Sequence, residues 1–600
     1  MKGYTRIRED LFCVEDSCRV YIIRRGDRCI LIDFGTGMAL QALEELGIHQ
    51  VEAVLMTHHH RDQGEGLSLA VKAGIPILVP ETEYDLFAHA NEMWQSREIF
   101  NNYNNRQDRF SILESVPAQK MLDYDTLHLL GMEITVLPTP GHTTGSVSLL
   151  VPMQGELMAF CGDLLCAPGK LWSLAATQWS YNGGEGIPHT VLSLLELQRR
   201  GVQWLLPSHG ERMEAETAIP PTVEKLARLR TLREQNPRLF QLRERPYEAI
   251  TPHVLFNRTS MANSYVLLSQ SGKAMIIDFG YDFMAGPAAG VDRSSRHPWL
   301  YTLPTLQEDF GVTRIDACIP THYHDDHVAG FNLLRRIYGT RVLCSSTFAD
   351  ILENPQGYDL PCLWYDPIPV DQRLPEETEF FWEEYRLVLH PLSGHTRFAV
   401  AIEVEADGEK ILFTGDQYAG DEGTLPNYVY KNLWDWEDFS ASAKLYRTIS
   451  PDWILSGHWT KKKPDESFYQ KLESIGTELS QLHRELLPEN GEQNPSNDFS
   501  ARFSPYQKEV APGETFTVSV ELLPPNQETL WGEAVVPNGF TLLQTQRQKN
   551  WLEFTLQAPM EPQRRSRLGC RVWREGNCLG TQAEMLITVL PDKKQEELGT

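Results

Sequence analysis

The chain has 600 residues, which is too long for a single hydrophobic core and predicts several domains. Hydrophobic residues make up 41% and charged residues 23%, as in folded soluble proteins, and no apolar run approaches the roughly 20 residues needed to cross a bilayer. The net charge of −26 argues against nucleic acid as a partner. The N-terminus lacks the apolar core of a signal peptide and the ten cysteines form no paired framework, so a cytoplasmic location is expected.

Residues 1–245 alternate apolar runs with loops that contain glycine, histidine and aspartate. A strand pair is predicted at Arg19–Arg24 and Cys29–Ile32, and it ends at Asp33. Four further motifs each follow an apolar run. These motifs are Thr57–Gln63 (THHHRDQ), Pro140–Thr143 (PGHT), Cys161–Asp163 (CGD) and Pro207–Gly210 (PSHG). Functional side chains gather on loops at strand ends, so this series predicts a polar site built from several strands.

Residues 246–490 repeat this series in the same order. The strand pair returns as Ser264–Leu268 and Ala274–Ile277, and it ends at Asp278. The later motifs return as Thr321–His327 (THYHDDH), Ser393–Thr396 (SGHT), Thr414–Asp416 (TGD) and Ser456–Trp459 (SGHW). The interval from the middle histidine to the aspartate is identical in the two copies. We interpret this as an internal duplication, with one domain in residues 1–245 and another in 246–490.

The cluster in the second copy carries three histidines and an aspartate directly after a strand-like run. His322, His324 and His327 offer imidazole nitrogens, and Asp326 adds an anionic oxygen. Zinc prefers this mixture, whereas magnesium and calcium prefer oxygen ligands alone. On an extended backbone, residues two apart face the same side, so His322 and His324 are expected to bind one ion while Asp326 and His327 turn toward a second. The sequence predicts two neighbouring cations.

The ordered motifs closely resemble the metallo-β-lactamase superfamily. The resemblance implies an α/β chain of two tandem αβ/βα four-layer sandwiches, with the metals at one edge of the two sheets of each sandwich. It implies a complete dinuclear site in the second domain, where Asp326 is also the catalytic residue that shuttles a proton. It assigns His322, His324 and His395 to one ion, Asp326, His327 and His458 to the other, and Asp416 to both. It also implies that Asp33 and Asp278 orient metal-bound histidines without binding metal themselves.

One ligand position differs between the copies. Gln63 stands where the second copy has His327, and an amide oxygen is a poorer zinc ligand than an imidazole nitrogen. The first domain is therefore expected to hold zero to two ions. Zinc is the expected metal, and iron or manganese stays open. The candidate ligands of the first domain are His58, His60, Asp62, His142, Asp163 and His209. A mononuclear site remains an alternative, on His58, His60, His142 and Asp163.

The last part of the chain has a different pattern. Residues 491–500 are polar and turn-rich and predict a linker. Alternating residues at Thr515–Val520, Trp551–Leu556 and Glu584–Val589 then predict a small all-β sandwich over 501–600. It resembles immunoglobulin-like modules, and a protein or glycan partner for it stays open. It contains no histidine, so no metal is assigned to it.

Paired cations can activate water for attack on an electrophilic carbonyl without a serine or cysteine nucleophile. Within the resembled family, Pro140–Ser146 and Cys161–Leu165 look most like the glyoxalase II and lactonase branches. This implies a zinc-dependent hydrolase of a small ester, thioester or lactone, although the glutathione-binding helical domain of glyoxalase II has no counterpart. The alternatives are a phosphodiesterase or nuclease, a first domain that resembles mononuclear-iron sulfur dioxygenases, and a non-catalytic metal-stabilised scaffold. The sequence does not predict the oligomeric state.

Overall fold

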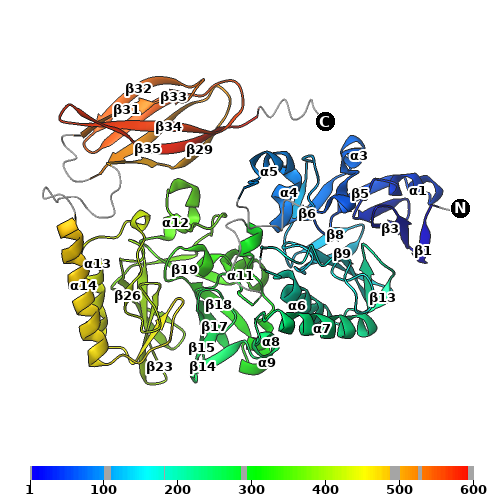
Figure 1. The fold of residues 1–600 in the computed structure, drawn as a ribbon, viewed down its shortest axis with the longest axis horizontal. Coiled ribbons are helices and arrows are strands. Elements are labelled where there is room, and N and C mark those ends of the chain that lie inside the picture. Colours follow the sequence, from blue (N-terminus) through cyan, green and yellow to red (C-terminus); the bar gives the residue numbers. More distant parts are fainter. Residues whose placement is uncertain are drawn as a thin grey trace. The chain divides into compact units, whose positions relative to one another are not determined.

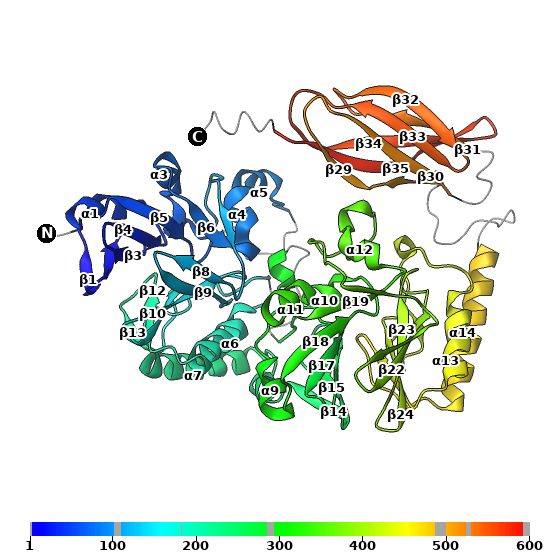
Figure 2. The same cartoon turned by 180° about the vertical axis from the view of Figure 1, so that it is seen from behind.

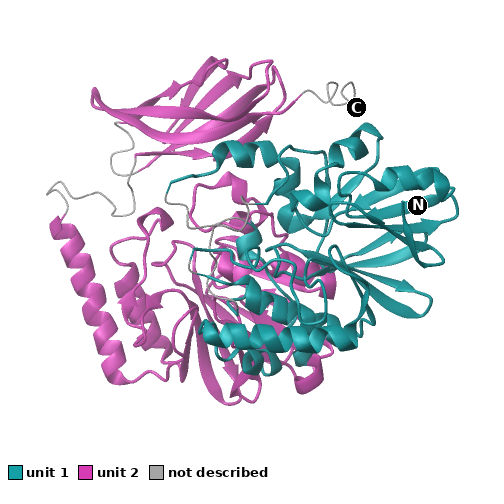
Figure 3. Ribbon diagram, turned by 45° about the vertical axis from the view of Figure 1, so that its right-hand side comes forward, with its two compact units in different colours: residues 1–246, 281–306 teal, residues 247–280, 307–600 magenta. Residues whose placement is uncertain are grey.

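The computed structural model describes residues 3–100, 110–181, 183–284, 293–486, 500–523 and 530–591. Most of the predicted linker, residues 491–499, lies outside these described residues. The chain forms two compact units, one of residues 1–246 with 281–306 and the other of residues 247–280 with 307–600 (Figure 3). Within the described ranges, no helix is both long enough and apolar enough to span a membrane.

Two β-sheets form the interior of the first unit (Figure 1). The first sheet contains, in spatial order, β1 (Thr5–Arg8), β2 (Leu11–Glu15), β3 (Arg19–Arg25), β4 (Arg28–Ile32), β5 (Gln50–Leu55), β6 (Ile77–Pro80) and β7 (Gln119–Met121). The second contains β13 (Met213–Glu214), β12 (Trp204–Pro207), β11 (Glu156–Gly162), β10 (Val147–Met153), β9 (Met132–Pro138) and β8 (Thr126–Leu129). Strands β4 to β7 run parallel, so their carboxyl ends meet at one edge.

Helices cover the outer face of each sheet in the first unit. These elements are α1 (Ala39–Glu45), α2 (Arg61–Gly64), α3 (Leu67–Lys72), η1 (Glu81–Glu83), α4 (Tyr84–Ala88), α5 (Ala90–Ser96), α6 (Gly186–Arg199), α7 (Ala215–Leu232) and α8 (Leu239–Glu244). Three apolar cores separate the layers. Ala39 of α1 packs with Leu31 of the first sheet, Ile30 packs between the sheets with Phe160, and Val191 of α6 packs with Leu205 behind the second sheet. This order of helix, sheet, sheet and helix confirms the predicted four-layer architecture.

The second unit repeats the pair of sheets. Its first sheet contains β14 (Tyr247–Thr251), β15 (Val254–Asn257), β16 (Ser264–Leu268), β17 (Lys273–Ile277), β18 (Arg314–Ile319), β19 (Arg341–Ser345) and β20 (Gln372–Leu374). Its second sheet contains β21 (Glu379–Trp382), β22 (Tyr385–Pro391), β23 (Val400–Ala406), β24 (Glu409–Gly415) and β27 (Trp453–Ser456). A short ribbon joins β25 (Tyr418–Ala419) to β26 (Leu425–Pro426). The duplication predicted from the sequence is thus repeated in the strand order.

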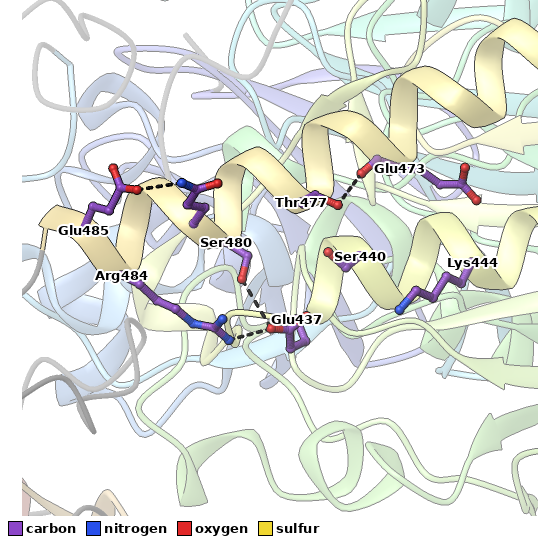
Figure 4. Close-up of a pocket in the computed structure, with 9 residues that line it drawn as sticks. Glu437, Ser440, Lys444, Glu473, Thr477, Ser480, Arg484 and Glu485 are labelled. Atoms are coloured by element: carbon purple, nitrogen blue, oxygen red, sulfur yellow. Dashed lines mark hydrogen bonds and ion pairs between the residues drawn. The ribbon is translucent and has the colours of Figure 1, made fainter.

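The helices of the second unit lie outside its sheets. They are α10 (Asp325–Val328), α11 (Phe331–Tyr338), α12 (Ala349–Glu353), η3 (Pro355–Gly357), η4 (Tyr430–Asn432), α13 (Asp438–Ile449) and α14 (Glu466–Leu486). Phe439 of α13 and Leu472 of α14 pack in one core with Leu412 of β24. A groove of about 570 Å³ runs between these two helices (Figure 4). Its Arg484 contacts Glu437 at 2.5 Å, and no histidine or cysteine lines it, so we assign it no metal.

The C-terminal region is an all-β sandwich of two sheets (Figure 2). One sheet contains β28 (Ala501–Ser504), β30 (Thr515–Leu522), β33 (Trp551–Gln557) and β32 (Thr541–Gln548). The other contains β29 (Gln507–Val510), β35 (Asn577–Val589), β34 (Gln563–Arg574) and β31 (Leu530–Val535). Alternate residues such as Phe516, Val518 and Val520 are buried, as the period of two requires. The predicted strands are confirmed.

A segment that follows Asp278 by a few residues belongs to the first unit. Residues 281–306 include η2 (Arg293–Arg296) and enter α9 (Pro304–Phe310). Trp299 is 5% exposed and Tyr301 is 9% exposed, and both join the core formed by α6 and α7. The predicted second domain, residues 246–490, includes this segment, whereas the structure places its described residues in the first unit.

Candidate metal centres

The first ligand cluster of the second domain lies where a buried strand ends. Strand β18 stops at Ile319, the backbone is extended at His324 (φ −62°, ψ 145°), and α10 begins at Asp325. The extended stretch turns His322 and His324 to one side, and the first turn of α10 brings His327 beside them. The ring centroid of His322 lies 4.5 Å from that of His324 and 4.1 Å from that of His327.

Glycines allow other strand ends to approach this cluster closely. Asp416 follows Gly415, which has a φ of +51° and where a Cβ would lie 2.6 Å from Thr321 Oγ1. A Cβ at Gly457 would overlap the carboxylate of Asp416. Both positions therefore require glycine, one for its left-handed conformation and its close packing and the other for space. This explains why the aspartate of one motif and the histidine of another each follow a glycine.

Three imidazoles converge in one half of the site. His322, His324 and His395 are 0%, 5% and 6% exposed, and their ligand atoms lie within 4.8 Å of one another. His395 Nε2 is 3.1 Å from His324 Nδ1. Two ligands that each stand about 2.1 Å from a tetrahedral zinc ion lie roughly 3.4 Å apart, so this spacing suits a shared ion. His322 Nε2 is buried and has no hydrogen-bond partner, which leaves its lone pair open.

Two carboxylates and two imidazoles form the other half. His458 Nε2 lies 2.9 Å from Asp326 Oδ2 and 3.2 Å from Asp416 Oδ2. His327 Nε2 lies 3.3 Å from Asp416 Oδ1, and both of these atoms are buried without a hydrogen-bond partner. Asp416 Oδ2 also lies 3.6 Å from His395 Nε2 in the first half. The structure thus brings all seven predicted ligands together, with Asp416 between the two groups.

A buried aspartate aims one of these imidazoles. Asp278 Oδ2 lies 2.9 Å from His327 Nδ1, and the Asp278 carboxylate also accepts hydrogen bonds from the amide and the hydroxyl of Thr321 at 2.7 and 2.8 Å. Asp278 therefore fixes the His327 ring with Nε2 directed at Asp416 and is itself held by the loop that carries the ligands. This is the orienting position that the sequence analysis predicts for it.

Two backbone carbonyl groups orient two more imidazole rings. The sequence contains no motif that predicts either contact. His395 Nδ1 lies 2.8 Å from Asn427 O, and His458 Nδ1 lies 3.1 Å from Met261 O. A proton on each Nδ1 leaves the Nε2 lone pair directed into the site. Gln417 adds support, because its Oε1 accepts a hydrogen bond from the His395 amide at 3.1 Å.

Burial and charge divide the site into two electrostatic halves. Burial, and then the charge of His395, lower the pKa of His324 to about 3, so this ring is neutral and offers a lone pair. Burial alone would also lower the pKa of His458, but Asp416 and Asp326 outweigh it and raise this pKa to about 10. The carboxylates therefore attract positive charge to the half where the second ion is predicted.

Removing the carboxylate of Asp278 is expected to weaken metal binding in the second domain. In Asp278→Ala the His327 ring loses its orienting partner, and losses of this kind cost about 10- to 100-fold in metal affinity. Competition against a chromophoric chelator measures this affinity. Asp33→Ala, at the matching position of the first copy, is the control and should leave the second-domain affinity unchanged. Equal losses in both variants would contradict the role of Asp278.

The first domain gathers three imidazoles in the same way. His142 Nε2 lies 3.0 Å from His60 Nδ1, and His58 Nε2 is buried without a hydrogen-bond partner. Asp163 Oδ2 lies 3.4 Å from His142 Nε2 and 3.7 Å from His58 Nε2. Burial, and then the charge of His142, lower the pKa of His58 to about 3. These residues fit one ion, as in the second domain.

The rest of the first site differs from its counterpart. Gln63 Nε2 donates a hydrogen bond to Asp163 Oδ2 at 3.1 Å, and His209 Nδ1 lies 2.8 Å from Asp163 Oδ1. Asp62 Oδ2 lies 3.5 Å from His209 Nε2. Asp33 accepts hydrogen bonds from Thr57 N at 2.8 Å and from Ser208 Oγ at 2.5 Å. Among the described residues it forms no hydrogen bond with an imidazole, because Gln63 stands where the second copy has His327, so Asp33 does not directly orient a histidine as predicted.

A buried glutamate outside the predicted motifs ties the ligand loops of the first domain together. Glu83 is 0% exposed, and its Oε2 accepts a hydrogen bond from His59 N at 2.9 Å. Its Oε1 accepts from Thr143 Oγ1 at 2.5 Å and from Gly145 N at 3.0 Å. Burial would raise the pKa of Glu83, but His59 outweighs it and the pKa falls to about 2. Its only sequence signal is a glutamate shortly after the apolar strand β6.

Comparison with known proteins agrees with this duplicated site. The family model described as "Metallo-beta-lactamase superfamily" matches twice, over residues 14–209 and 258–458. The hydroxyacylglutathione hydrolase of Aeromonas salmonicida is 26% identical over 151 residues, which are 25% of this chain and 47% of that protein. The hydroxyacylglutathione hydrolase of Pseudomonas entomophila is 29% identical over 145 residues, which are 24% of this chain and 44% of that protein. The chain thus spans less than half of these relatives.

Solved structures give matches of the same kind. A metallo-beta-lactamase of Cronobacter sakazakii with a HARLDQ motif is 17% identical, with a TM-score of 0.30, and covers 40% of this chain and 94% of that chain. A metallo-beta-lactamase family protein of Thermus thermophilus is 21% identical, with a TM-score of 0.29, and covers 39% of this chain and 82% of that chain. Because the family model matches both copies and together they make up more than half of the residues, the chain belongs to the metallo-beta-lactamase superfamily.

Proposed function

We propose that the second domain is a metal-dependent hydrolase that uses two zinc ions. The observation that carries this proposal is the convergence of all seven ligand side chains, with the lone pairs of buried atoms such as His322 Nε2 and Asp416 Oδ1 left open. Buried polar atoms are normally hydrogen-bonded, so these open atoms are suited to bind a metal ion. Imidazole with a few carboxylates is the donor set that suits zinc.

The residues of this chain also suit the transfer of a proton. Two divalent cations bound here would supply an activated water and polarise the carbonyl oxygen of a substrate. The Asp326 side chain is 16% exposed, against 7% for Asp416, so Asp326 is the carboxylate more open to solvent. It is therefore placed to accept a proton from the attacking water and return it to the leaving group. His458 Nε2 lies 2.9 Å from Asp326 Oδ2, close enough for the two residues to share an ion.

We further propose a small ester, thioester or lactone as the substrate. The curated relatives named above are hydroxyacylglutathione hydrolases, which supports a thioester. The net charge of −26 does not favour a polyanionic substrate, which argues against a nuclease. We assign no glutathione specificity, because the matched relatives are covered over less than half of their length.

A substrate panel tests this proposal. The zinc-loaded chain is assayed against an acyl thioester, an acyl lactone and bis-p-nitrophenyl phosphate, together with Asp326→Ala. Turnover of the thioester or lactone that disappears in Asp326→Ala is the expected result. Asp62→Ala is the matched control in the first copy and should retain this turnover. Turnover of the phosphodiester alone would favour a nuclease, and zinc binding without any turnover would favour a non-catalytic scaffold.

A further inference from the structure

The position of Gln63 changes how the first domain holds its central carboxylate. In the second domain the corresponding His327 faces Asp416 through an open Nε2 atom. In the first domain the Gln63 side chain is fully buried and donates a hydrogen bond from Nε2 to Asp163 Oδ2. An amide N–H has no lone pair to give to a metal ion. Gln63 Oε1 is buried without a hydrogen-bond partner, but an amide oxygen is a poor zinc ligand, so the imidazole that would bind the second ion is replaced by a weaker ligand whose N–H group donates to the carboxylate.

The ring of His209, the histidine of the last motif in the first copy, is oriented differently from the ring of His458 in the second copy. His458 directs Nε2 at two carboxylates and Nδ1 at a backbone carbonyl. His209 has the opposite orientation, with Nδ1 2.8 Å from Asp163 Oδ1 and Nε2 3.1 Å from Ser17 O. The ring lies flat on Trp172, with a centroid distance of 4.0 Å and an interplanar angle of 3°. Both nitrogens of His209 are therefore engaged, and the stacking opposes rotation of the ring.

Both oxygens of Asp163 are occupied by these contacts, Oδ2 by Gln63 and Oδ1 by His209. Asp62, Asp163 and His209 lie close enough to suggest a metal group of their own. This group is less suited to a transition-metal ion than the three-histidine group. It contains one imidazole, and that imidazole already has two hydrogen-bond partners. The three-histidine group instead retains an open atom, His58 Nε2.

We infer that the first domain binds a single divalent transition-metal ion on His58, His60 and His142, and that hydrogen bonds from Gln63 and His209 to Asp163 take the place of a second ion. The three imidazoles suit zinc or iron(II). The first copy nevertheless retains the carboxylate that could orient a histidine at position 63. Asp33 lies at the position of Asp278 and forms no hydrogen bond with an imidazole in the described part of the chain. A histidine at position 63 is expected to form a hydrogen bond with the Asp33 carboxylate, as His327 does with Asp278. This single-ion site does not require the hydrolase activity proposed for the second domain.

Metal stoichiometry tests the inference without an activity assay. The full chain with His322→Ala, Asp416→Ala and His458→Ala serves as the background, so that both predicted ion positions of the second domain lose ligands. After loading with Zn²⁺ and gel filtration, native mass spectrometry is expected to find one ion per chain. The double change Gln63→His/Trp172→Ala in this background supplies the imidazole and frees the His209 ring to rotate, and it should raise the count to two, whereas Gln63→Leu should leave it at one. Two ions or none in the background, or one ion in Gln63→His/Trp172→Ala, would overturn the inference.

X-ray absorption at the zinc edge locates the ion. Three imidazole ligands are expected in the background chain, and a single imidazole would overturn the inference in favour of the group around Asp62. Mass spectrometry of a matched pair of variants also distinguishes the three-histidine group from the group around Asp62. Asp62→Ala should retain the ion and His58→Ala should lose it, and the reverse result would contradict the assignment. Circular dichroism checks that the two variants are equally folded.

Discussion

Asp416→Ala is expected to reduce hydrolysis by the second domain by at least about 10³-fold. Asp416 lies between the two ligand groups, within 3.6 Å of nitrogen atoms of His327, His395 and His458. Loss of this carboxylate therefore weakens both ion positions at once. Metal-ion catalysis contributes several kcal/mol, and each 1.4 kcal/mol corresponds to about a tenfold change in rate. The measurement is kcat/KM of the zinc-loaded chain on the best substrate of the panel, with metal content determined on the same sample.

The first copy provides the matched control for this variant. Asp163→Ala removes the corresponding carboxylate from the first domain and should leave kcat/KM close to that of the wild-type chain. Thermal unfolding of both variants shows whether a loss of activity reflects a loss of fold. Full activity in Asp416→Ala, or equal losses in the two variants, would show that the second domain does not carry the reaction.

The double variant Trp299→Ala/Tyr301→Ala is expected to destabilise the first unit strongly. The two rings lie 4.8 Å apart in the core with α6, and Trp299 also stacks on His189 at 5.6 Å. Replacing one buried aromatic residue by alanine typically costs about 3–5 kcal/mol, and whole domains are stable by about 5–15 kcal/mol. Because the two residues touch, their costs are not expected to add fully.

Hydrogen exchange measures this effect in the intact chain. Peptides from α6, residues 186–199, should lose most of their protection in the double variant, whereas peptides from α13 and α14 should not. Phe381→Ala, at a side chain that is 70% exposed, is the control and should change stability by less than about 0.5 kcal/mol. Unchanged protection of α6 would contradict the placement of residues 281–306 in the first unit.

The layers of the fold and the ligand positions could be predicted because each leaves a local signal. The apolar runs that end at Ile277 and Ile319 are parallel strands, and parallel strands bring their carboxyl ends to one edge. Each ligand motif follows an apolar strand, and glycines at positions such as Gly415 permit the close approach. Because the same motifs occur in the same order in both copies, each copy supports the ligand positions predicted in the other.

The parts that the sequence could not predict depend on contacts distant along the chain. The carbonyls of Asn427 and Met261 orient two histidines, and every residue type has such a carbonyl. Apolar residues such as Trp299 and Tyr301 predict burial, but they do not predict in which of the two similar domains they are buried. The turned ring of His209 depends on stacking against Trp172, which lies in a loop without a motif.

Anomalous X-ray diffraction at the zinc edge on crystals of the zinc-loaded chain is the most direct test of the second-domain site. We expect two peaks there, one among His322, His324 and His395 and the other among Asp326, His327 and His458, with Asp416 next to both. The absence of either peak, or peaks away from these side chains, would contradict a dinuclear centre in the second domain.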